Sequence, residues 1–556
     1  MLTSKRSFLT LAALTVVSAS AQEPIDAAAN ARIREEALQH SEVMATLHQL
    51  TDVFSPRLTG SPTYKAAAEW SRDRMKAWGL SNARLETWNW GHPGWANERC
   101  AAHVEAPWKG HLAVEVLAWT PSTQGTARGA AFHLPVPDEP TQEELNAVLH
   151  AAADKVAGKI VLAGILKEVP ALNPNPSAPR LSDESLAKRF DPSNPNPPRM
   201  PAPSARRPGA LEPRAINEQV DAFLVAHKAL ARINDSALRN GQIRAFSNRS
   251  YDLAKVVPTL AMRHEDYGRI CRVLKDGKEV QLALEIANRL YPENTHGYNV
   301  IAEVPGSSKA SEVVMLGAHL DSWHTATGAT DNGVNAAIMM EVGRILQKLG
   351  KPRRTIRIAL WDGEEHGLLG SAAYVDAHYG SAEAPKPAFG ELVACFNTDA
   401  GAGQIRGLSV FGPPAGAQVL RELVAPFSDL AVKGASSSAF RPSRLRSGPS
   451  SDSASFSAAG LPTINVAQDG LEYFEYTWHT TLDTLERVPP EDPKRTAAVL
   501  ASVAWHLATR EERLPFFTKE TLPPVPPPPA PAATPAATPA STPASTPAQA
   551  PAQTKP

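Results

Sequence analysis

Histidine and carboxylate residues follow three apolar runs in the second half of the 556-residue chain. The runs at 313–320, 355–361 and 392–397 lead into three polar motifs: His319-Leu320-Asp321, Asp362-Gly363-Glu364-Glu365 and Asn397-Thr398-Asp399. Two further candidates, Asp331 and His479, lie in loops. A set of imidazole and carboxylate ligands without thiolates is typical of a catalytic zinc site rather than a closed structural one.

The number of candidates indicates more than one metal ion. Five ligands can hold two metals about 3.5–4 Å apart when one carboxylate bridges them. Residues two apart on a strand point the same way, so Asp321 can accept a hydrogen bond from His319 and fix its tautomer. In the pair Glu364-Glu365, one carboxylate can bind metal while the other moves a proton. Each residue alone is weak evidence, because a single histidine or aspartate at a strand end is usually a cap or a surface group.

These residues need a sheet that brings strand ends together. Apolar runs at 299–304, 313–320, 355–361, 392–397 and 462–466 read as strands, and amphipathic patterns at 66–78 and 335–349 read as helices. Alternation of this kind predicts an α/β fold with helices on both faces of the sheet. In such folds the site forms beyond the carboxyl ends of the strands, which is where the polar motifs lie.

A second, β-rich region interrupts this α/β domain. Predicted strands at 158–163, 256–261 and 280–286, with a short helix at 265–274, indicate an inserted module at 116–290. The α/β domain is therefore expected to be discontinuous, over 22–115 and 291–515. Proline and arginine crowd residues 166–215, which we interpret as a solvated loop without a binding partner.

The two ends of the chain read as an export signal and a tail. Lys5 and Arg6 precede a short apolar run at 8–17 and the small residues Ala19-Ser20-Ala21, a signal-peptide pattern over 1–21. We therefore expect an exported protein, periplasmic or extracellular, with an uncleaved membrane anchor as the alternative. No other stretch is long and apolar enough to span a bilayer. Residues 521–556 are almost entirely Pro, Ala, Thr and Ser and are expected to be disordered.

Composition excludes some classes of function. A net charge of -1 does not provide the basic surface of a nucleic-acid-binding protein. Three cysteines, Cys100, Cys271 and Cys395, allow one disulfide at most. The oligomeric state is left open.

The ordered motifs resemble metallopeptidase family twenty-eight. The resemblance rests on the three strand-end motifs together with Pro56-Arg57-Leu58-Thr59-Gly60-Ser61, Asp331-Asn332-Gly333, Gly367-Leu368-Leu369-Gly370-Ser371, Ser451-Asp452-Ser453 and His479-Thr480. It implies a mixed-sheet, phosphorylase/hydrolase-like zinc-exopeptidase domain, and the inserted region is similar to the protease-associated module of several family members. The chain departs from many relatives at Ser453, where they have histidine, and this puts local substrate contacts in doubt.

The resemblance implies a role for each residue. His319 and Asp399 are expected to bind one zinc ion, Glu365 and His479 a second, and Asp331 to bridge the two. Glu364 is the implied general base, Asp321 the residue that orients His319, and the peptide bond between Asp331 and Asn332 is expected to be cis. His324 follows Asp321 closely, and we interpret it as a loop histidine because the ligand set is already complete.

The implied activity is hydrolysis of short peptides, either as an aminopeptidase or as a dipeptidase or carboxypeptidase. Glu472-Tyr473-Phe474 and Ser451-Asp452 are most similar to the carboxypeptidase Q branch of the family, and no residue stands out as the one that binds a peptide terminus. Three alternatives remain: a glutaminyl cyclase-like acyltransferase with one zinc ion, a non-catalytic relative with the same fold, and a binding protein that acts through the inserted module and the tail.

Overall fold

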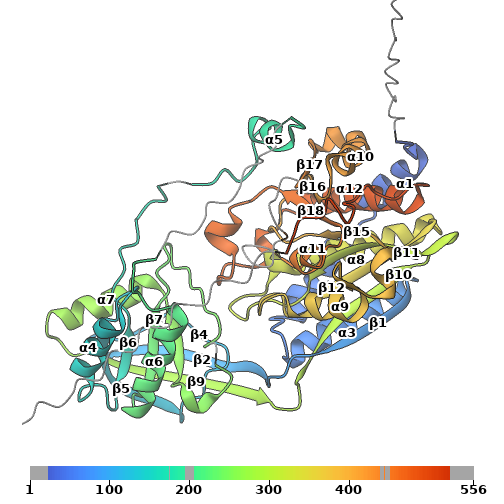
Figure 1. Ribbon diagram of the computed structural model, residues 1–556. Helices are drawn as coiled ribbons and strands as arrows, with labels where there is room; N and C mark the ends of the chain where they lie inside the picture. Colours follow the sequence, from blue (N-terminus) through green and yellow to red (C-terminus); the bar gives the residue numbers. More distant parts are fainter. Residues whose placement is uncertain are drawn as a thin grey trace, which may run out of the picture.

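Two separate eight-stranded sheets organise the chain in the computed structural model (Figure 1). The structure describes residues 23–525 except 175, 194–205, 249, 439–443 and 445–450. The predicted signal peptide at 1–21 and most of the predicted tail at 521–556 lie outside the described residues. Among the helices that are described, none is long and apolar enough to cross a membrane.

The first sheet holds the apolar runs that the sequence predicts as strands. Its strands, from one edge to the other, are β1 (Ser81–Asn89), β10 (His296–Val304), β12 (Arg354–Trp361), β11 (Lys309–His319), β15 (Leu392–Asn397), β18 (Thr463–Gln468), β16 (Ile405–Phe411) and β17 (Gly434–Ser437). The four central strands β12, β11, β15 and β18 are parallel, whereas β1, β10 and β16 are antiparallel to their neighbours toward the centre. A central parallel strand is covered on both faces, which explains its nearly continuous apolar sequence.

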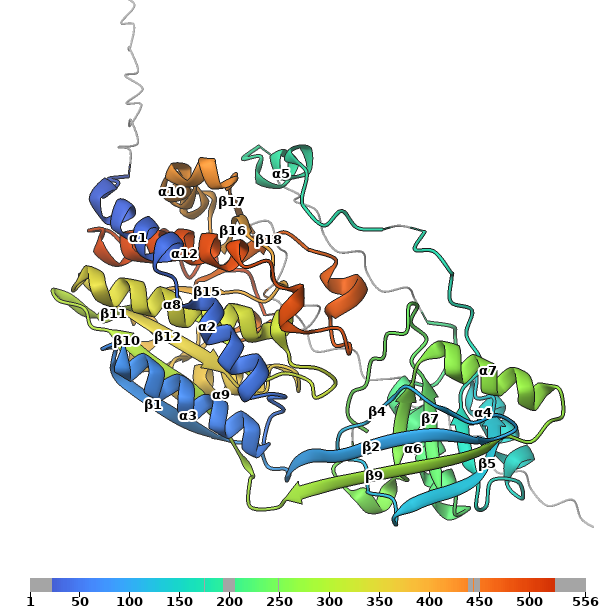
Figure 2. The same cartoon turned by 180° about the vertical axis from the view of Figure 1, so that it is seen from behind.

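Helices cover both faces of this sheet (Figures 1 and 2). The larger apolar core lies on one face, against α1 (Ala27–Gln39), α2 (Val43–His48), α3 (Pro62–Ala77), α8 (Val334–Leu349), α10 (Pro414–Val424) and α12 (Glu491–Thr509). A smaller core on the opposite face contains residues of α9 (Leu369–His378) and α11 (Ser453–Ala459). The predicted mixed α/β architecture is confirmed.

The second sheet forms the inserted region. Its strands are, in spatial order, β3 (Gly110–His111), β2 (Gly94–Ala106), β9 (Gln281–Tyr291), β5 (Thr126–Leu134), β6 (Ile160–Ala163), β7 (Ala231–Asp235), β8 (Thr259–Met262) and β4 (Val114–Val116). The helices of this region are α4 (Gln142–Ala152), α6 (Pro213–Ala226) and α7 (His264–Lys275). Two apolar clusters pack in this region, and the tryptophan-rich one also includes Leu58, Trp88 and Trp323 from outside the second sheet.

The inserted sheet begins earlier than the predicted boundary at residue 116. Strand β2 pairs with β9 from Gly94 opposite Tyr291 to Ala106 opposite Gln281, so residues 94–115 belong to the second sheet. The long β2–β9 ribbon is visible in Figure 2 as the connection between the two sheets. The sequence motifs of the inserted module lie far from β2, and the pairing of β2 with β9 depends on residues almost two hundred positions apart.

The proline- and arginine-rich segment is not a free loop, which corrects the prediction for 166–215. It contains α5 (Asp183–Phe190), capped by the Ser182 hydroxyl, and it leads into α6 at Pro213. Leu186 and Phe190, one helical turn apart, are buried against Ala467 of the first sheet. Figure 1 shows the segment running from the inserted region to the edge of the first sheet, where α5 lies beside β17.

Candidate metal centre

Three parallel strands deliver the strand-end residues to one edge of the first sheet. Strand β11 ends at His319, which lies opposite Trp361, the last residue of β12. The chain then continues from β12 into Asp362-Gly363-Glu364-Glu365, and from β15 into Asp399. The register therefore places the predicted ligands of all three strands side by side.

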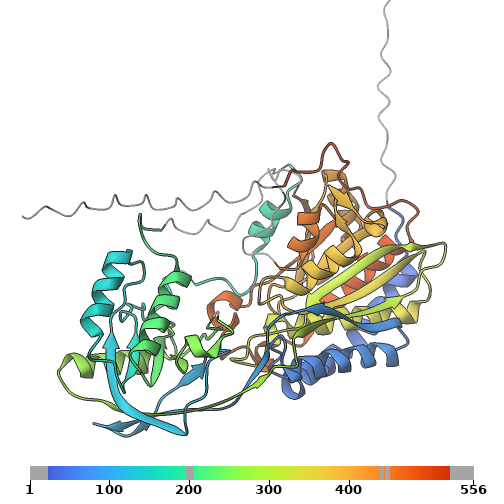
Figure 3. The ribbon, with the colours of Figure 1, turned by 60° about the horizontal axis from the view of Figure 1, so that its bottom comes forward.

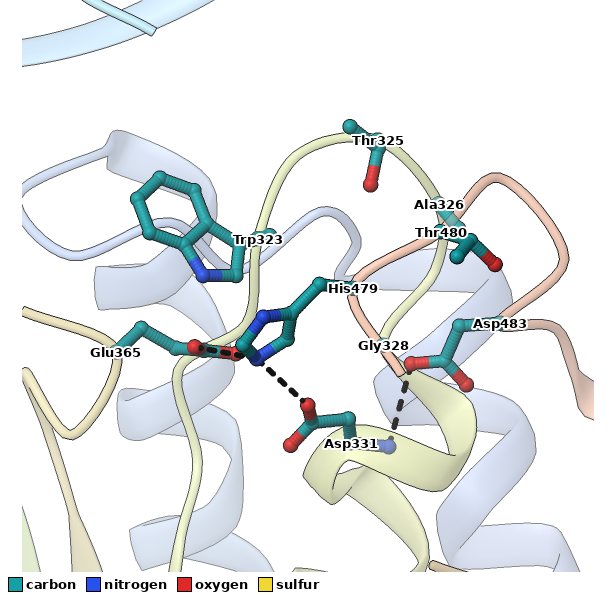
Figure 4. Close-up of a pocket in the computed structure, with 9 residues that line it drawn as sticks. All are labelled: Trp323, Thr325, Ala326, Gly328, Asp331, Glu365, His479, Thr480 and Asp483. Carbon is teal, nitrogen blue, oxygen red and sulfur yellow. Dashed lines mark hydrogen bonds and ion pairs between the residues drawn. The ribbon is translucent and has the colours of Figure 1, made fainter. Parts of the chain in front are cut away.

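The five predicted ligands form two groups that share Asp331. His319, Asp331 and Asp399 compose one group, and Asp331, Glu365 and His479 the other. In the first group His319 Nε2 lies 3.3 Å from Asp331 Oδ1 and 3.6 Å from Asp399 Oδ1. In the second, His479 Nε2 lies 3.1 Å from Asp331 Oδ2 and 3.0 Å from Glu365 Oε2, as Figure 4 shows. The two oxygens of Asp331 thus face different histidines.

The loop that carries His479 has an unusual backbone. His479 follows the short helical turn Tyr473–Thr477 and adopts a positive φ of 59°. A left-handed backbone is uncommon outside glycine and costs on the order of 1–3 kcal/mol, so surrounding contacts must hold it. Two of these contacts are with the rings of Phe246, nearly perpendicular to the imidazole, and Trp478, whose centroids lie 5.3 Å and 4.2 Å from that of the imidazole.

Asp321 positions the site residues mainly through hydrogen bonds with backbone groups. Its carboxylate accepts hydrogen bonds from the amides of Glu364 (3.3 Å) and Glu365 (3.2 Å), which fixes the turn that carries both glutamates. His319 Nδ1 lies 3.0 Å from the Asp321 carbonyl oxygen and 3.5 Å from the Asp321 carboxylate. When Nδ1 donates to that carbonyl, Nε2 keeps its lone pair for a metal ion.

A buried aspartate orients the shared ligand. Asp483 accepts hydrogen bonds from the amides of Thr330 (2.6 Å) and Asp331 (3.2 Å) and from the Thr330 hydroxyl (2.7 Å). These bonds fix the short turn Ala329–Gly333 that presents Asp331. The bond between Asp331 and Asn332 is cis, as the family resemblance implies.

A buried arginine holds the loop between His319 and Asp331. The Arg57 guanidinium donates to the carbonyl oxygens of Leu320 (2.7 Å), Thr327 (2.9 Å) and Gly328 (2.8 Å), and also to Leu50. Gly328 has a φ of +62°, and a Cβ there would lie 2.4 Å from Ser322 and 2.9 Å from the guanidinium, so the close approach requires glycine. Burial lowers the pKa of Arg57 to about 10, which leaves it charged at neutral pH.

The centre has more negative than positive charge in a buried setting. Burial raises the pKa of Glu365 to about 7, and burial raises the pKa of Glu364 well above its usual value. Burial opposes protonation of His479, but the carboxylates of Glu365 and Asp331 raise its pKa to about 10. Carboxylates packed this closely favour a bound cation, because a dication offsets their mutual repulsion.

The donor atoms themselves fit a metal of the zinc type. His319 Nε2, Asp331 Oδ2 and Glu365 Oε1 are buried and make no hydrogen bond within the described residues. Buried polar atoms are almost always paired, so unpaired atoms that face one another call for a ligand. Imidazole nitrogen and carboxylate oxygen are the donors found in catalytic zinc sites.

The remaining predicted residues lie outside the metal groups. His324 Nε2 contacts the Val116 carbonyl oxygen of the inserted sheet at 2.6 Å, in agreement with its interpretation as a loop histidine. Ser453 begins α11 and is buried. The three cysteines have free thiols.

Sequence reasoning gave no role to Arg57 or to Asp483. Arg57 belongs to the motif at 56–61, for which the sequence suggested no function. Its partners between Leu320 and Gly328 lie about 265 positions away. Asp483 follows His479 by four residues, and that proximity is the one local signal that could have pointed to it.

Comparisons with known proteins identify relatives of this site. Residues 299–504 match the family model of peptidase family M28. Carboxypeptidase Q of Mus musculus is 30% identical over 260 residues, which cover 47% of this chain and 52% of the relative. Leucine aminopeptidase 2 of Trichophyton equinum is 38% identical over 121 residues, which cover 22% of this chain and 23% of the relative. The chain thus spans about half the length of the carboxypeptidase Q relatives it matches.

Solved structures show the same architecture. A peptidase M28 precursor from Shewanella amazonensis SB2B has a TM-score of 0.60 and 25% identity, with 88% of this chain and 98% of that chain covered. An aminopeptidase from Aneurinibacillus sp. strain AM-1 has a TM-score of 0.51 at 18% identity, over 88% of this chain and 98% of that chain, and it is similar in fold.

Proposed function

We propose, from the match of residues 299–504 to the family model of peptidase family M28, that the protein is a zinc-dependent exopeptidase that hydrolyses short peptides. The observation that carries the proposal is the pair of ligand groups that share Asp331. A shared carboxylate between two sets of nitrogen and oxygen donors matches a site for two zinc ions rather than one. His319 and Asp399 would hold one ion, and Glu365 and His479 the other.

The chain's own residues would divide the remaining work. When bound, zinc supplies a Lewis acid that polarises the scissile carbonyl and makes water nucleophilic near neutral pH. Glu364 lies next to the predicted ligand Glu365, on the turn that Asp321 fixes. It would accept the proton of the attacking water and return it to the leaving amine. His319, held through Nδ1, keeps its lone pair directed at the metal.

Replacing Glu364 tests this assignment. We expect Glu364→Gln to retain the zinc content of the wild type and to reduce kcat by at least about a hundredfold, because general-base catalysis contributes on the order of 10²–10⁴. Zinc content is measured by elemental analysis, and kcat on a free dipeptide. Glu486→Gln, a change of an exposed glutamate beyond His479, serves as the matched control and should retain full activity. Wild-type turnover in Glu364→Gln would contradict the assignment.

A small substrate panel separates the alternatives. Chelator-sensitive cleavage of free dipeptides and amino-acid anilides, but not of N-blocked peptides, indicates an aminopeptidase or dipeptidase. Cleavage of N-blocked peptides indicates a carboxypeptidase. Cyclisation of N-terminal glutamine with a single zinc ion per chain would support the acyltransferase alternative, and no chelator-sensitive reaction would support a binding protein.

We also propose that the chain is exported, on the basis of the signal-peptide pattern at 1–21. Export would supply peptides from outside the cytoplasm as substrates. Recovery of a product that begins at Gln22 from the periplasm or medium of an expressing host would support export, and recovery of the full-length chain from the cytoplasm would contradict it.

A further inference from the structure

Arg244 links the inserted region to the loop that carries a metal ligand. It forms an isolated antiparallel bridge with Thr480, next to His479. The neighbouring Thr481 amide donates to the Ile243 carbonyl oxygen at 3.0 Å. In Figure 3 the orange turn that precedes His479 lies against the green inserted region. The side chain of Arg244 is therefore anchored beside the metal centre although it comes from the other sheet's region.

The guanidinium of Arg244 has no carboxylate partner. Among the described residues, no carboxylate forms an ion pair with it, and its Nε is buried without a hydrogen bond. Its contacts are a hydrogen bond to the Trp478 carbonyl oxygen at 3.2 Å and the face of the Trp478 ring, 4.8 Å away. Burial lowers the pKa of Arg244, with no opposing carboxylate. A half-buried cation of this kind is costly unless an anion joins it.

Other charged groups around Arg244 are already paired. Arg244 lines a cavity of about 210 Å³ on the inserted sheet, together with Arg214 and Arg232. Arg232 donates to Asp221 at 2.8 Å, and Arg214 to Glu218 at 2.8 Å. Asp235, a further carboxylate of the lining, contacts His264 at 2.9 Å. Within the described lining, Arg244 is thus the arginine that lacks a counter-charge.

The cavity begins one aromatic ring away from the metal centre. Phe246 lines the cavity, and its ring lies 5.3 Å from the His479 ring and 5.2 Å from the Trp323 ring. His479 and Trp323 in turn line the pocket that contains Asp331 and Glu365 (Figure 4). Phe246 therefore lies between the metal centre and the cavity that Arg244 lines.

We infer that Arg244 binds a carboxylate of the peptide substrate and so sets which peptides the centre accepts. This inference rests on the proposed exopeptidase function. A guanidinium offers two parallel N–H donors that match a carboxylate, and its free Nε is one of them. Consecutive Cα atoms lie about 3.8 Å apart, so the terminal carboxylate of a dipeptide stays within one residue of the scissile bond. The carboxylate is either that terminal group or an acidic side chain.

Four peptides distinguish these sources: leucyl-alanine, leucyl-alanine amide, leucyl-glutamate amide and glutamyl-alanine amide. We expect the wild type to cleave leucyl-alanine with a kcat/KM about ten- to a hundredfold above that of its amide, the value of one charge-assisted contact. Preference for either glutamate-containing amide over leucyl-alanine amide would identify a side-chain carboxylate instead. Equal kcat/KM on all four peptides would overturn the inference and leave the exopeptidase proposal intact.

Variants of Arg244 test whether this residue causes the preference for a carboxylate substrate over its amide. Arg244→Gln should remove the preference for the carboxylate over the amide substrate, mainly by raising the KM of the carboxylate substrate. Arg244→Lys should restore part of the ratio, because it restores the charge without the two-pronged geometry. The matched control is Arg269→Gln: Arg269 also stacks on a tryptophan, Trp108 at 4.1 Å, and is exposed on α7. A purely structural role for Arg244 would lower both activities equally and would overturn the inference.

A binding measurement keeps the inference testable without turnover. Reduced-bond leucyl-alanine, in which CH2–NH replaces the peptide bond, and its amide are titrated calorimetrically into the zinc-loaded full chain. Tighter binding of the carboxylate form by the wild type, lost in Arg244→Gln, is expected. Equal binding of the two forms would overturn the inference. Absence of chelator-sensitive hydrolysis together with an intact carboxylate preference would instead reject the exopeptidase proposal alone.

Discussion

At the scale of single residues, Asp331 is the predicted ligand that the two candidate metal groups share. One of its oxygens faces His319 at 3.3 Å and the other faces His479 at 3.1 Å. Burial raises its pKa, but the two neighbouring histidines lower it below the usual value, so the carboxylate is ionised. Removing Asp399 takes a donor from one group, whereas removing Asp331 takes one from both.

Metal content should therefore respond differently to the two losses. We expect Asp331→Ala to retain less than one zinc ion per chain after dialysis and Asp399→Ala to retain about one, against two in the wild type. Elemental analysis of the dialysed proteins measures this. Asp376→Ala, at an exposed position of α9, is the control and should match the wild type. Two ions in Asp331→Ala would mean that the carboxylate does not bridge.

The sequence predicts the ligands but not the residues that hold them. His319, Glu365 and Asp399 were predictable because each ends or follows an apolar run, and strand ends of a parallel sheet meet at one edge. Arg57 and Arg244 act on carbonyl groups at Leu320 and Trp478, more than two hundred positions away. No local pattern records such a contact, so only the folded chain reveals it.

At the scale of elements, strands were predicted more reliably than the segments that connect them. The central strands β11, β12 and β15 lie within a few residues of their predicted limits, because a strand buried on both faces has a continuous apolar sequence. Helix α5 was missed, since its two buried residues, Leu186 and Phe190, are too few to give a periodic pattern. Its position depends on a surface of the first sheet that the local sequence does not contain.

Strand β4 carries a half-buried acid that should make the inserted region sensitive to pH. Burial raises the pKa of Glu115 to about 7, and the carboxyl has no hydrogen bond or ion pair within the described residues. The unfolded chain loses this proton near pH 4.5, so between about 4.5 and 7 the folded state holds more protons than the unfolded state. Stability therefore falls as pH rises through this window and stays lower above it.

Replacing Glu115 with glutamine should remove this dependence. We expect Glu115→Gln to be more stable than the wild type at pH 8 by on the order of 2 kcal/mol, and equally stable at pH 4. Urea unfolding at each pH, with hydrogen exchange of the inserted sheet as the readout, measures the difference in stability between the variant and the wild type. Glu105→Gln, which alters an exposed acid paired with Arg128, should change little at either pH. A Glu115→Gln effect of equal size at both pH values would rule out the ionisation of Glu115 as its cause.

At the scale of the whole molecule, the segment at 166–190 links the inserted region to the first sheet and contacts the turn before His479. Glu475, in the turn before His479, accepts hydrogen bonds from the Ser177 amide (2.6 Å) and hydroxyl (2.8 Å). The Leu471 amide donates to the Pro179 carbonyl oxygen at 3.0 Å. The segment thus supports the turn that precedes His479. It also forms a second connection between the inserted region and the first sheet, distant from the β2–β9 ribbon.

Arg180 is the residue of this segment whose removal should cost most. It donates to Asp469 at 3.1 Å and also to Asp492, and both carboxylates are buried in the first sheet's region. Asp469 keeps Arg406 when Arg180 is removed, but Asp492 loses its cation and retains only amide donors such as Gln404. A buried carboxylate without a counter-charge is strongly unfavourable, although the partial exposure of Arg180 reduces the loss.

We therefore expect Arg180→Ala to lower the free energy of unfolding by about 2 kcal/mol and to speed hydrogen exchange from 469 to 479, because the segment detaches from the sheet. Urea unfolding and mass-spectrometric hydrogen exchange measure these effects. Arg207→Ala provides the control, since Arg207 belongs to the same proline- and arginine-rich segment but pairs with the exposed Glu144, and it should leave both quantities unchanged. If Arg180→Ala changed neither the free energy of unfolding nor hydrogen exchange from 469 to 479, the segment would be a passive connection that does not support the turn before His479.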